Sequence, residues 1–282
     1  MEACGYFGYN PKFRELVKSG KYPLSLVDAC VKRILTLKFR LGLFDEPYAR
    51  KKDLAKIHCE KHIKIAEEIA QKGIVLLKND GVLPLSQDKK IAVIGPNGNL
   101  NQLGNYICYA TEKGKGVAED SLSLFGALKE GGINCRYAMG SGFHKNTEEQ
   151  LQEAYDLARE SDVVVLALGD NSKGGKNAGA QKADTDGKIP DLVVTSGEGY
   201  DLNRIELTKA QEQLFDRVRS AGKPVVMILY GGRPHAITEQ LDGCSAVLFG
   251  FGAGERGNEA MRDILFGKVN PSGRLPVSFP RS

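Results

Sequence analysis

Residues 162–168 read DVVVLAL, in which Asp162 is followed by an uninterrupted apolar run that is rich in β-branched residues. Similar runs lie at 224–229 (PVVMIL) and 246–251 (AVLFGF), and shorter ones at 74–77, 91–94 and 135–139. Segments that are apolar along most of their length, rather than at every second position, are typical of strands in a sheet covered on both faces. The sequence therefore predicts a buried sheet of six strands.

Amphipathic helices are predicted between these strands, at residues 121–130, 148–160, 209–220 and 255–265. Alternation of strands and helices predicts an α/β fold with a mostly parallel six-stranded sheet and helices on both faces. In such sheets ligands bind at the carboxyl ends of the strands, where the loops gather.

The residues before the first strand are predicted to be helical, with a turn-like, basic linker at 44–52. The expected helices span residues 11–19, a long stretch that ends at Gly42, and about 53–72. We therefore expect three parts, namely a helical segment at 1–43, a linker with a leading helix at 44–73, and the α/β domain at 74–282.

Composition and charge exclude several classes of protein. The chain has 39 Lys and Arg against 35 Asp and Glu, a net charge of +4, and the two signs are interspersed. This pattern gives no support to a role in binding nucleic acid or a membrane surface. No apolar run approaches the ~18 residues of a membrane span, and the first residues carry no signal-peptide pattern.

The six cysteines, at positions 4, 30, 59, 108, 135 and 244, form no CxxC motif. Most of them lie in apolar segments, where free thiols behave as small hydrophobic residues. We therefore expect a reducing compartment and a cytoplasmic rather than secreted protein, although an even number of cysteines leaves disulfides open.

A connection of almost forty residues, 170–207, separates one predicted strand from the next helix. Ordinary connections of this kind run about 2–6 residues, so this one is either functional or disordered. Its second half places Glu198 between two glycines, where no neighbouring side chain shields the carboxylate. Such a group is suited to general acid/base catalysis. The pattern alone is more typical of a solvated surface glutamate.

Three other motifs are interpreted as structural. The turn at 95–99 lacks the spacing of a nucleotide-binding loop, and the SxxK match at 86–89 has no partner motifs. His58 and His62 lie four residues apart, but the HExxH pattern of a zinc site is missing, so both are expected on a helix surface. No metal site or organic cofactor is predicted.

The order of several motifs along the chain resembles glycoside hydrolase family 3. Residues 27–45 resemble the segment that closes the N-terminal barrel of that family. Stretches that resemble the entry, later strands and end of its second domain lie at 73–80, 83–85, 91–96, 222–226, 232–234, 265–267 and 270–276. The resemblance covers nearly the whole chain and implies an (α/β)6 sandwich, preceded by a short helical remnant of a TIM-like barrel.

The resemblance also implies a retaining exo-β-glycosidase of the β-glucosidase type that uses no cofactor. In that family an aspartate of the barrel attacks the sugar, and a glutamate on a loop of the sandwich domain serves as acid and base. Residues 196–201 (SGEGYD) resemble the motif that carries this glutamate, so Glu198 inherits the acid/base role. Retaining hydrolysis requires two carboxyl groups about 5–5.5 Å apart, one ionised and one protonated. Tyr200, Asp201 and Tyr106 are the expected substrate-binding residues.

The barrel of the family would precede this chain, so we expect the nucleophilic aspartate to be missing. The chain is expected to be inactive alone and to act on a β-glucoside or oligosaccharide together with a separate or preceding barrel. The apolar face of residues 1–42 is expected to pack on the sandwich domain or to drive self-association into a homo-oligomer. The alternative is a non-catalytic carbohydrate-binding or scaffold module of the same fold. The sugar and its linkage stay open, as does the choice between a natural half-protein and an excised fragment.

Overall fold

The computed structural model describes residues 10–101, 103–104, 121–171, 195–197 and 204–281. The chain divides into two compact units, Met1–Ile57 and His58–Ser282. The four residues expected to be functional, Glu198, Tyr200, Asp201 and Tyr106, lie outside the described residues.

The first unit contains the two helices predicted at its start, α1 (Pro11–Lys18) and α2 (Leu24–Arg40), and the 3-10 helix η1 (Lys51–Lys56). The side chain of Asn10 caps α1 by accepting a hydrogen bond from the backbone nitrogen of Phe13 at 3.0 Å. None of the three helices has a buried residue. Several apolar side chains of α2 are exposed, including Leu24, Leu37 and Phe39. Their role in self-association stays a prediction.

The second unit is built on one six-stranded sheet with the order β1-β6-β5-β4-β2-β3. The strands are β1 (Val75–Asn79), β2 (Ile91–Ile94), β3 (Cys135–Ala138), β4 (Val163–Gly169), β5 (Val225–Tyr230) and β6 (Ala246–Phe251). Only the edge strand β1 is antiparallel to its neighbour, and β2 to β6 run parallel. The predicted mostly parallel α/β sheet of six strands is confirmed.

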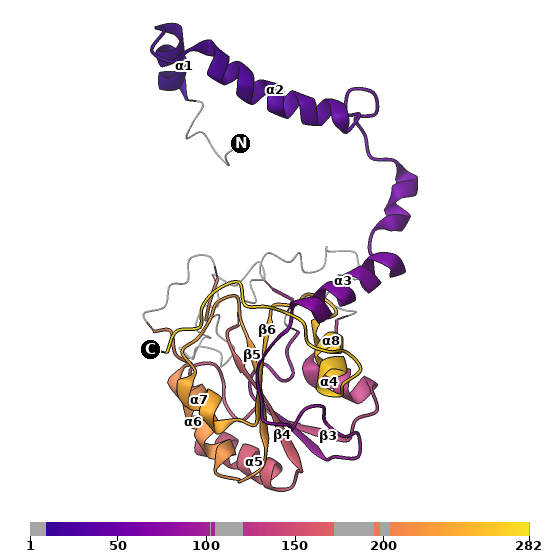
Figure 1. The fold of residues 1–282 in the computed structure, drawn as a ribbon, viewed down its shortest axis with the longest axis vertical. Coiled ribbons are helices and arrows are strands. Elements are labelled where there is room, and N and C mark those ends of the chain that lie inside the picture. The colour runs from indigo at the N-terminus through magenta and orange to yellow at the C-terminus, as the bar shows by residue number, and fades with distance from the viewer. Residues whose placement is uncertain (1–9, 102, 105–120, 172–194, 198–203, 282) are drawn as a thin grey trace, which may run out of the picture. The chain divides into compact units, whose positions relative to one another are not determined.

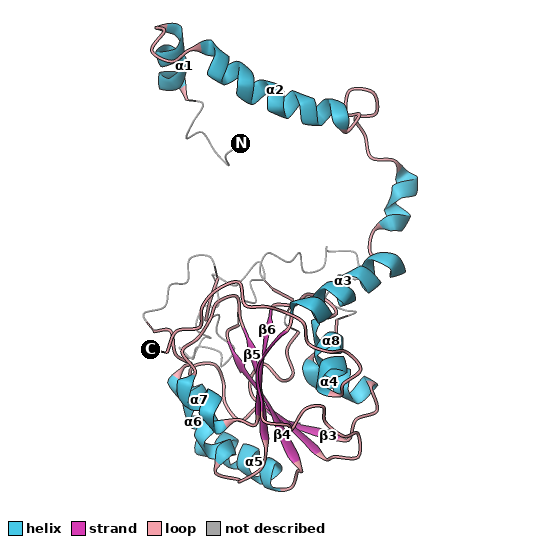
Figure 2. Cartoon of the chain, viewed as in Figure 1, coloured by secondary structure: helices cyan, strands magenta, loops and turns pink. Residues whose placement is uncertain are grey.

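Helices cover both faces of this sheet (Figures 1 and 2). The helices α3 (Glu60–Gly73), α4 (Leu124–Glu130) and α8 (Gly257–Leu265) lie on one face, and α5 (Glu148–Arg159), α6 (Lys209–Arg219) and α7 (Thr238–Gly243) on the other. Hydroxyl side chains cap three of them, with Ser123 before α4, Thr147 before α5 and Thr208 before α6.

Strand β4 contributes alternate residues to two separate hydrophobic cores. Its Val164, Leu166 and Leu168 pack with side chains of α5 and α6, in a core that includes Leu214. Its Val163, Val165 and Ala167 pack on the opposite face, in a core that includes Met261 of α8. All seven residues of β4 are buried, which explains why its sequence is continuously apolar.

One expectation about local structure was wrong, and one helix was not predicted. The helix expected from about residue 53 to 72 is interrupted, because α3 begins only at Glu60 and His58 adopts a positive φ of 51°. His58 therefore precedes the helix, and its Nε2 lies 2.6 Å from Oε2 of Glu255. This tertiary interaction overrides local helix propensity. The helix α7 was not predicted, because its six residues are too few to show a helical period.

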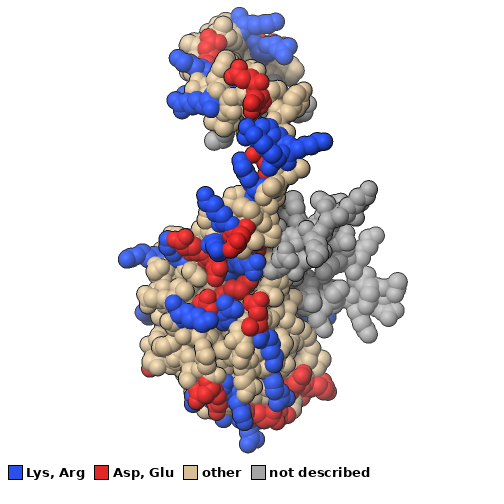
Figure 3. Space-filling view, turned by 90° about the vertical axis from the view of Figure 1, so that its right-hand side faces the viewer, with Lys and Arg blue, Asp and Glu red and all other residues tan. Residues whose placement is uncertain are grey.

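The described surface agrees with the mixed charge of the sequence. Figure 3 shows basic and acidic side chains interspersed over the face that it presents. In the described part of the chain, no helix is both long and apolar enough to cross a bilayer. The four cysteines of that part, Cys30, Cys59, Cys135 and Cys244, are free thiols.

The packing of β4 against β5 predicts that Gly169→Ala is strongly destabilising. Gly169 has a φ of 113°, and a Cβ atom there would lie 2.0 Å from the carbonyl oxygen of Tyr230. We expect the free energy of unfolding, measured by urea denaturation, to fall by about 3 kcal/mol or more. The control is Gly222→Ala, which shares a positive φ of 70° but meets nothing within 4 Å and should cost about 1 kcal/mol. If both variants lost the same free energy of unfolding, β4 and β5 would have room for a side chain at residue 169.

Candidate functional site

The carboxyl ends of β2 and β4 form the topological switch point of the sheet. The chain leaves β2 for a helix on one face of the sheet, and it leaves β4 for a helix on the other face. Ligand sites of open α/β sheets lie in the crevice that such a divergence creates. The long connection that carries Glu198 in the sequence starts at this point, directly after β4.

Two hydrogen bonds from Asn97, which follows β2, join the ends of these two strands. The backbone nitrogen of Asn97 donates to the carbonyl oxygen of Ala167 at 3.3 Å, and its side-chain amide donates to the carbonyl oxygen of Asp170 at 3.3 Å. Gly95 has a φ of 112°, and a Cβ atom there would lie 2.3 Å from the same Ala167 oxygen. A side chain is excluded at this position, so Gly95 is required for the close approach of the turn to β4.

A buried carboxylate, Asp170, lies at the end of β4 and is 4% exposed. Its Oδ2 accepts a hydrogen bond from Nε of Arg233 at 3.1 Å, and its Oδ1 accepts from Nη2 of the same residue at 3.3 Å. Nε2 of His235 lies 3.1 Å from Oδ2. The hydroxyl of Thr195 donates to Oδ1 at 3.0 Å. Four donor groups therefore converge on this carboxylate.

These partners keep Asp170 ionised. Burial raises the pKa of its carboxyl group, but the hydrogen bonds and charges of His235 and Arg233 outweigh that effect and bring the pKa below its usual value. A carboxylate cannot donate a hydrogen bond, so Nε2 of His235 carries the proton. Among the described residues, Nδ1 of His235 has no hydrogen-bond partner.

Thr195, which follows residues 172–194 in the sequence, links this part of the chain to Asp170 and Asn171. Its backbone nitrogen donates to the carbonyl oxygen of Asn171 at 2.8 Å, and its hydroxyl oxygen accepts from the backbone nitrogen of Asn171 at 2.9 Å. Thr195 is 3% exposed. Residues 171 and 195, which flank residues 172–194 in the sequence, therefore lie side by side.

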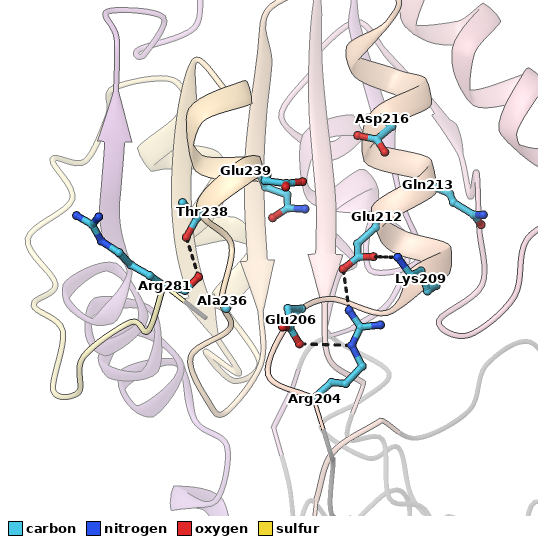
Figure 4. Close-up of a pocket in the computed structure, with 11 residues that line it drawn as sticks. Arg204, Glu206, Lys209, Glu212, Gln213, Asp216, Ala236, Thr238, Glu239 and Arg281 are labelled. Atoms are coloured by element: carbon cyan, nitrogen blue, oxygen red, sulfur yellow. Dashed lines mark hydrogen bonds and ion pairs between the residues drawn. The ribbon is translucent and has the colours of Figure 1, made fainter.

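Two hollows adjoin this cluster. A cavity of about 310 Å³ is bounded by the cluster and by the start of α6, and burial lowers the pKa of His144, which lines it. A polar hollow of about 530 Å³ lies beside it, between α6 and α7 (Figure 4).

Arg204 lines both hollows. Its guanidinium lies 3.4 Å from Glu206 and 3.2 Å from Glu212, and Glu212 is also 3.2 Å from Lys209. Arg204, Lys209, Glu206 and Glu212 are thus paired with one another in a local network of charges.

Sequence reasoning missed the cluster of Asp170, Thr195, Arg233 and His235. The signal was present, because Asp170 directly follows β4 and a Gly-Gly-Arg-Pro-His segment follows β5. Adjacent parallel strands place the residues after their carboxyl ends at the same edge of the sheet. Among the described residues, no group of three or more His, Cys, Asp or Glu side chains is arranged to hold a metal ion.

The burial of Asp170 predicts a pH-dependent loss of stability in Asp170→Asn. The amide removes the negative charge that Arg233 pairs with, and we expect the free energy of unfolding to fall by about 3 kcal/mol at neutral pH. Because the native pKa is lowered, this contribution is fully present above the unfolded pKa of about 3.9 and is lost as the pH falls through the native value. The difference between wild type and variant, measured by urea denaturation, should therefore narrow in acid below about pH 4. A difference that widens toward low pH would contradict the assignment.

Comparisons with known proteins agree with this architecture. Residues 74–282 match the family model described as the glycosyl hydrolase family 3 C-terminal domain. The chain is 32% identical to a β-xylosidase of Formosa agariphila, over 92% of this chain and 34% of that protein. It is 28% identical to a periplasmic β-glucosidase of Salmonella typhimurium, over 97% of this chain and 36% of that protein.

The chain is also similar in fold and sequence to a protein of solved structure. The β-glucosidase from Listeria innocua in complex with gluconolactone has a TM-score of 0.75 and 30% sequence identity, over 95% of this chain and 34% of that one. The chain thus spans about a third of the length of the curated relatives that it matches. The match to the family model over residues 74–282 includes the six-stranded sheet and the Asp170 cluster. The chain belongs to glycoside hydrolase family 3, whose C-terminal domain it contains.

Proposed function

We propose that this chain supplies the acid/base half of a retaining exo-β-glycosidase of the β-glucosidase type, with Glu198 as the general acid and base. The observation that carries the proposal is the anchoring of Thr195, three residues before Glu198, at the carboxyl edge of the sheet. This edge is where α/β folds hold their ligands. The relatives that bear β-glucosidase and β-xylosidase names support a terminal β-linked sugar as substrate.

In the proposed reaction Glu198 first protonates the oxygen of the leaving group, while a carboxylate attacks the anomeric carbon from the other side. Glu198 then removes a proton from the water that hydrolyses the glycosyl–enzyme intermediate. The attacking aspartate comes from a barrel domain outside this chain, which the longer relatives have room for. Tyr200, Asp201 and Tyr106 are proposed to contact the sugar or the leaving group. This chemistry needs two carboxyl groups and water.

The proposal predicts that the pure chain is inactive and that a barrel restores activity. Without the nucleophile, the 282-residue chain should hydrolyse aryl β-glucosides and β-xylosides no faster than buffer. Mixing it with a separately expressed barrel domain of the family should produce turnover. The control is the same mixture with Glu198→Gln. Substantial turnover by the chain alone, abolished by Glu198→Gln, would contradict the need for a partner. Retention of sugars without restored turnover would indicate a binding module instead.

The role of Glu198 predicts a dependence on the leaving group. In the barrel-containing protein, Glu198→Gln should slow alkyl glycosides and disaccharides by about 10²-fold or more, because these poor leaving groups need protonation. Dinitrophenyl glycosides leave without a proton, so their glycosylation step should be much less affected. Steady-state kcat/KM for a series of leaving groups measures this difference. Equal losses across the series would argue against the assignment of Glu198.

A further inference from the structure

We infer that Thr195 and Asp170 are positioning residues that hold the acid/base segment in place, an inference that rests on the proposed role of Glu198. Neither residue is given a role by the hydrolytic chemistry itself. Their described contacts join the start of the 172–194 segment to its end and attach both to the sheet. The proposal is that this attachment places Glu198 for proton transfer.

The first step of the argument is the rigidity of Asp170. Its backbone nitrogen donates to the carbonyl oxygen of Tyr230 at 2.8 Å, and Gly169 before it leaves no space for a side chain between β4 and β5. Its carboxylate contacts two nitrogens of the Arg233 guanidinium and Nε2 of His235, which is buried and 2% exposed. Both partners belong to the segment that follows β5. Asp170 is therefore a fixed point, joined to two adjacent strands of the sheet.

The second step is the bond from this fixed point to Thr195. The Thr195 hydroxyl uses its donor toward Asp170 at 3.0 Å and its acceptor toward the backbone nitrogen of Asn171 at 2.9 Å. Both partners are fixed by the end of β4, and Thr195 is 3% exposed. A buried hydroxyl whose donor and acceptor are both satisfied by fixed groups has one favourable position. The backbone at residue 195 is held in place accordingly.

The third step is the short chain from Thr195 to Glu198. Three residues reach at most about 10 Å even when fully extended, so the anchor limits where the glutamate can go. Gly197, the residue before Glu198, has a φ of 136° and takes part in an isolated β-bridge, so its backbone is held as well. The described restraints on this side of Glu198 are therefore the anchor at Thr195 and the bridge at Gly197. Proton transfer depends on such restraint, since a misplacement of about 1 Å can cost about 10²-fold in rate.

The Thr195→Val and Thr195→Ser variants separate the hydroxyl from the shape of the side chain. Valine has nearly the same volume but neither donates to Asp170 nor accepts from Asn171, whereas serine keeps both hydrogen bonds. The matched control is Asp162→Asn, at the other end of β4, where an exposed carboxylate accepts from the backbone nitrogen of Lys90 at 2.8 Å. All variants are measured in the barrel-containing protein, beside Glu198→Gln.

We expect Thr195→Val to reproduce the leaving-group selectivity of Glu198→Gln in weaker form. Its kcat/KM on alkyl glycosides should fall by about tenfold or more, and on dinitrophenyl glycosides by less than about twofold. Thr195→Ser and Asp162→Asn should stay within about twofold of wild type on both substrates. A purely structural role would lower the amount of active protein and reduce both rates equally. Two results would overturn the inference. One is an equal loss of kcat/KM on alkyl and dinitrophenyl glycosides in Thr195→Val. The other is the same pair of kcat/KM values in the valine and serine variants.

A second measurement tests the anchor in the 282-residue chain without catalysis. In Thr195→Val the backbone amide of Asn171 loses its acceptor, so amide hydrogen exchange at residues 171 and 195 should accelerate by about fivefold or more. Exchange in β4 and β5 should stay unchanged, which excludes global unfolding. Unchanged exchange at 171 and 195 would overturn the anchor.

The failures of the two proposals are distinguishable. If Glu198→Gln shows no leaving-group selectivity, the proposed function fails, and the positioning role fails with it. If Glu198→Gln is selective and Thr195→Val is not, only the positioning role of Thr195 is refuted.

Discussion

The ionised carboxylate of Asp170 is the interaction on which the carboxyl edge of this sheet depends. Removing a carboxylate from water costs several kcal/mol, and the cost is recovered only when hydrogen bonds and opposite charges surround the ion. Arg233 and His235, in the segment after β5, and Thr195, in the connection after β4, provide these bonds from two different stretches of the chain. Their convergence determines where the chain leaves the sheet and where it returns.

The sheet itself brings these groups within reach of one another. In the parallel pair of β4 and β5, Gly169 lies opposite Tyr230, so Asp170 and Arg233 follow the same edge. The approach of the two strands is close because Gly169 has no side chain to keep them apart. On the other side of β4, Asn97 donates to the carbonyl oxygen of Asp170. The hydrophobic cores on the two faces of the sheet thus support a polar edge that reaches across three strands.

The sequence was sufficient for the sheet but not for this polar edge. β4, β5 and β6 were predicted because each is long enough for continuous apolar character to be recognised. The parallel pairing of β4 with β5 followed from the helix predicted between them, whereas the helix between β5 and β6 was not predicted. The approach of Asp170 to His235 depends on which strands are neighbours, and the periodicity of a single strand carries no such information. The break before α3 was missed for a similar reason, since His58 pairs with Glu255, nearly two hundred residues away in the chain.

The proposed catalysis imposes opposite requirements on two carboxyl groups close together in the chain. Glu198 must hold a proton when the substrate arrives, whereas Asp170 must be ionised to keep its donors in place. An unpaired negative charge near an acid raises the pKa of that acid and weakens it as a proton donor. The bidentate guanidinium of Arg233 balances the charge of Asp170, so the carboxylate can anchor the segment while its field is largely cancelled. In the proposed reaction, the charge of Asp170 therefore does not oppose the loss of the proton from Glu198. A structural carboxylate can thus lie at the edge of the sheet where the proposed acid/base segment begins.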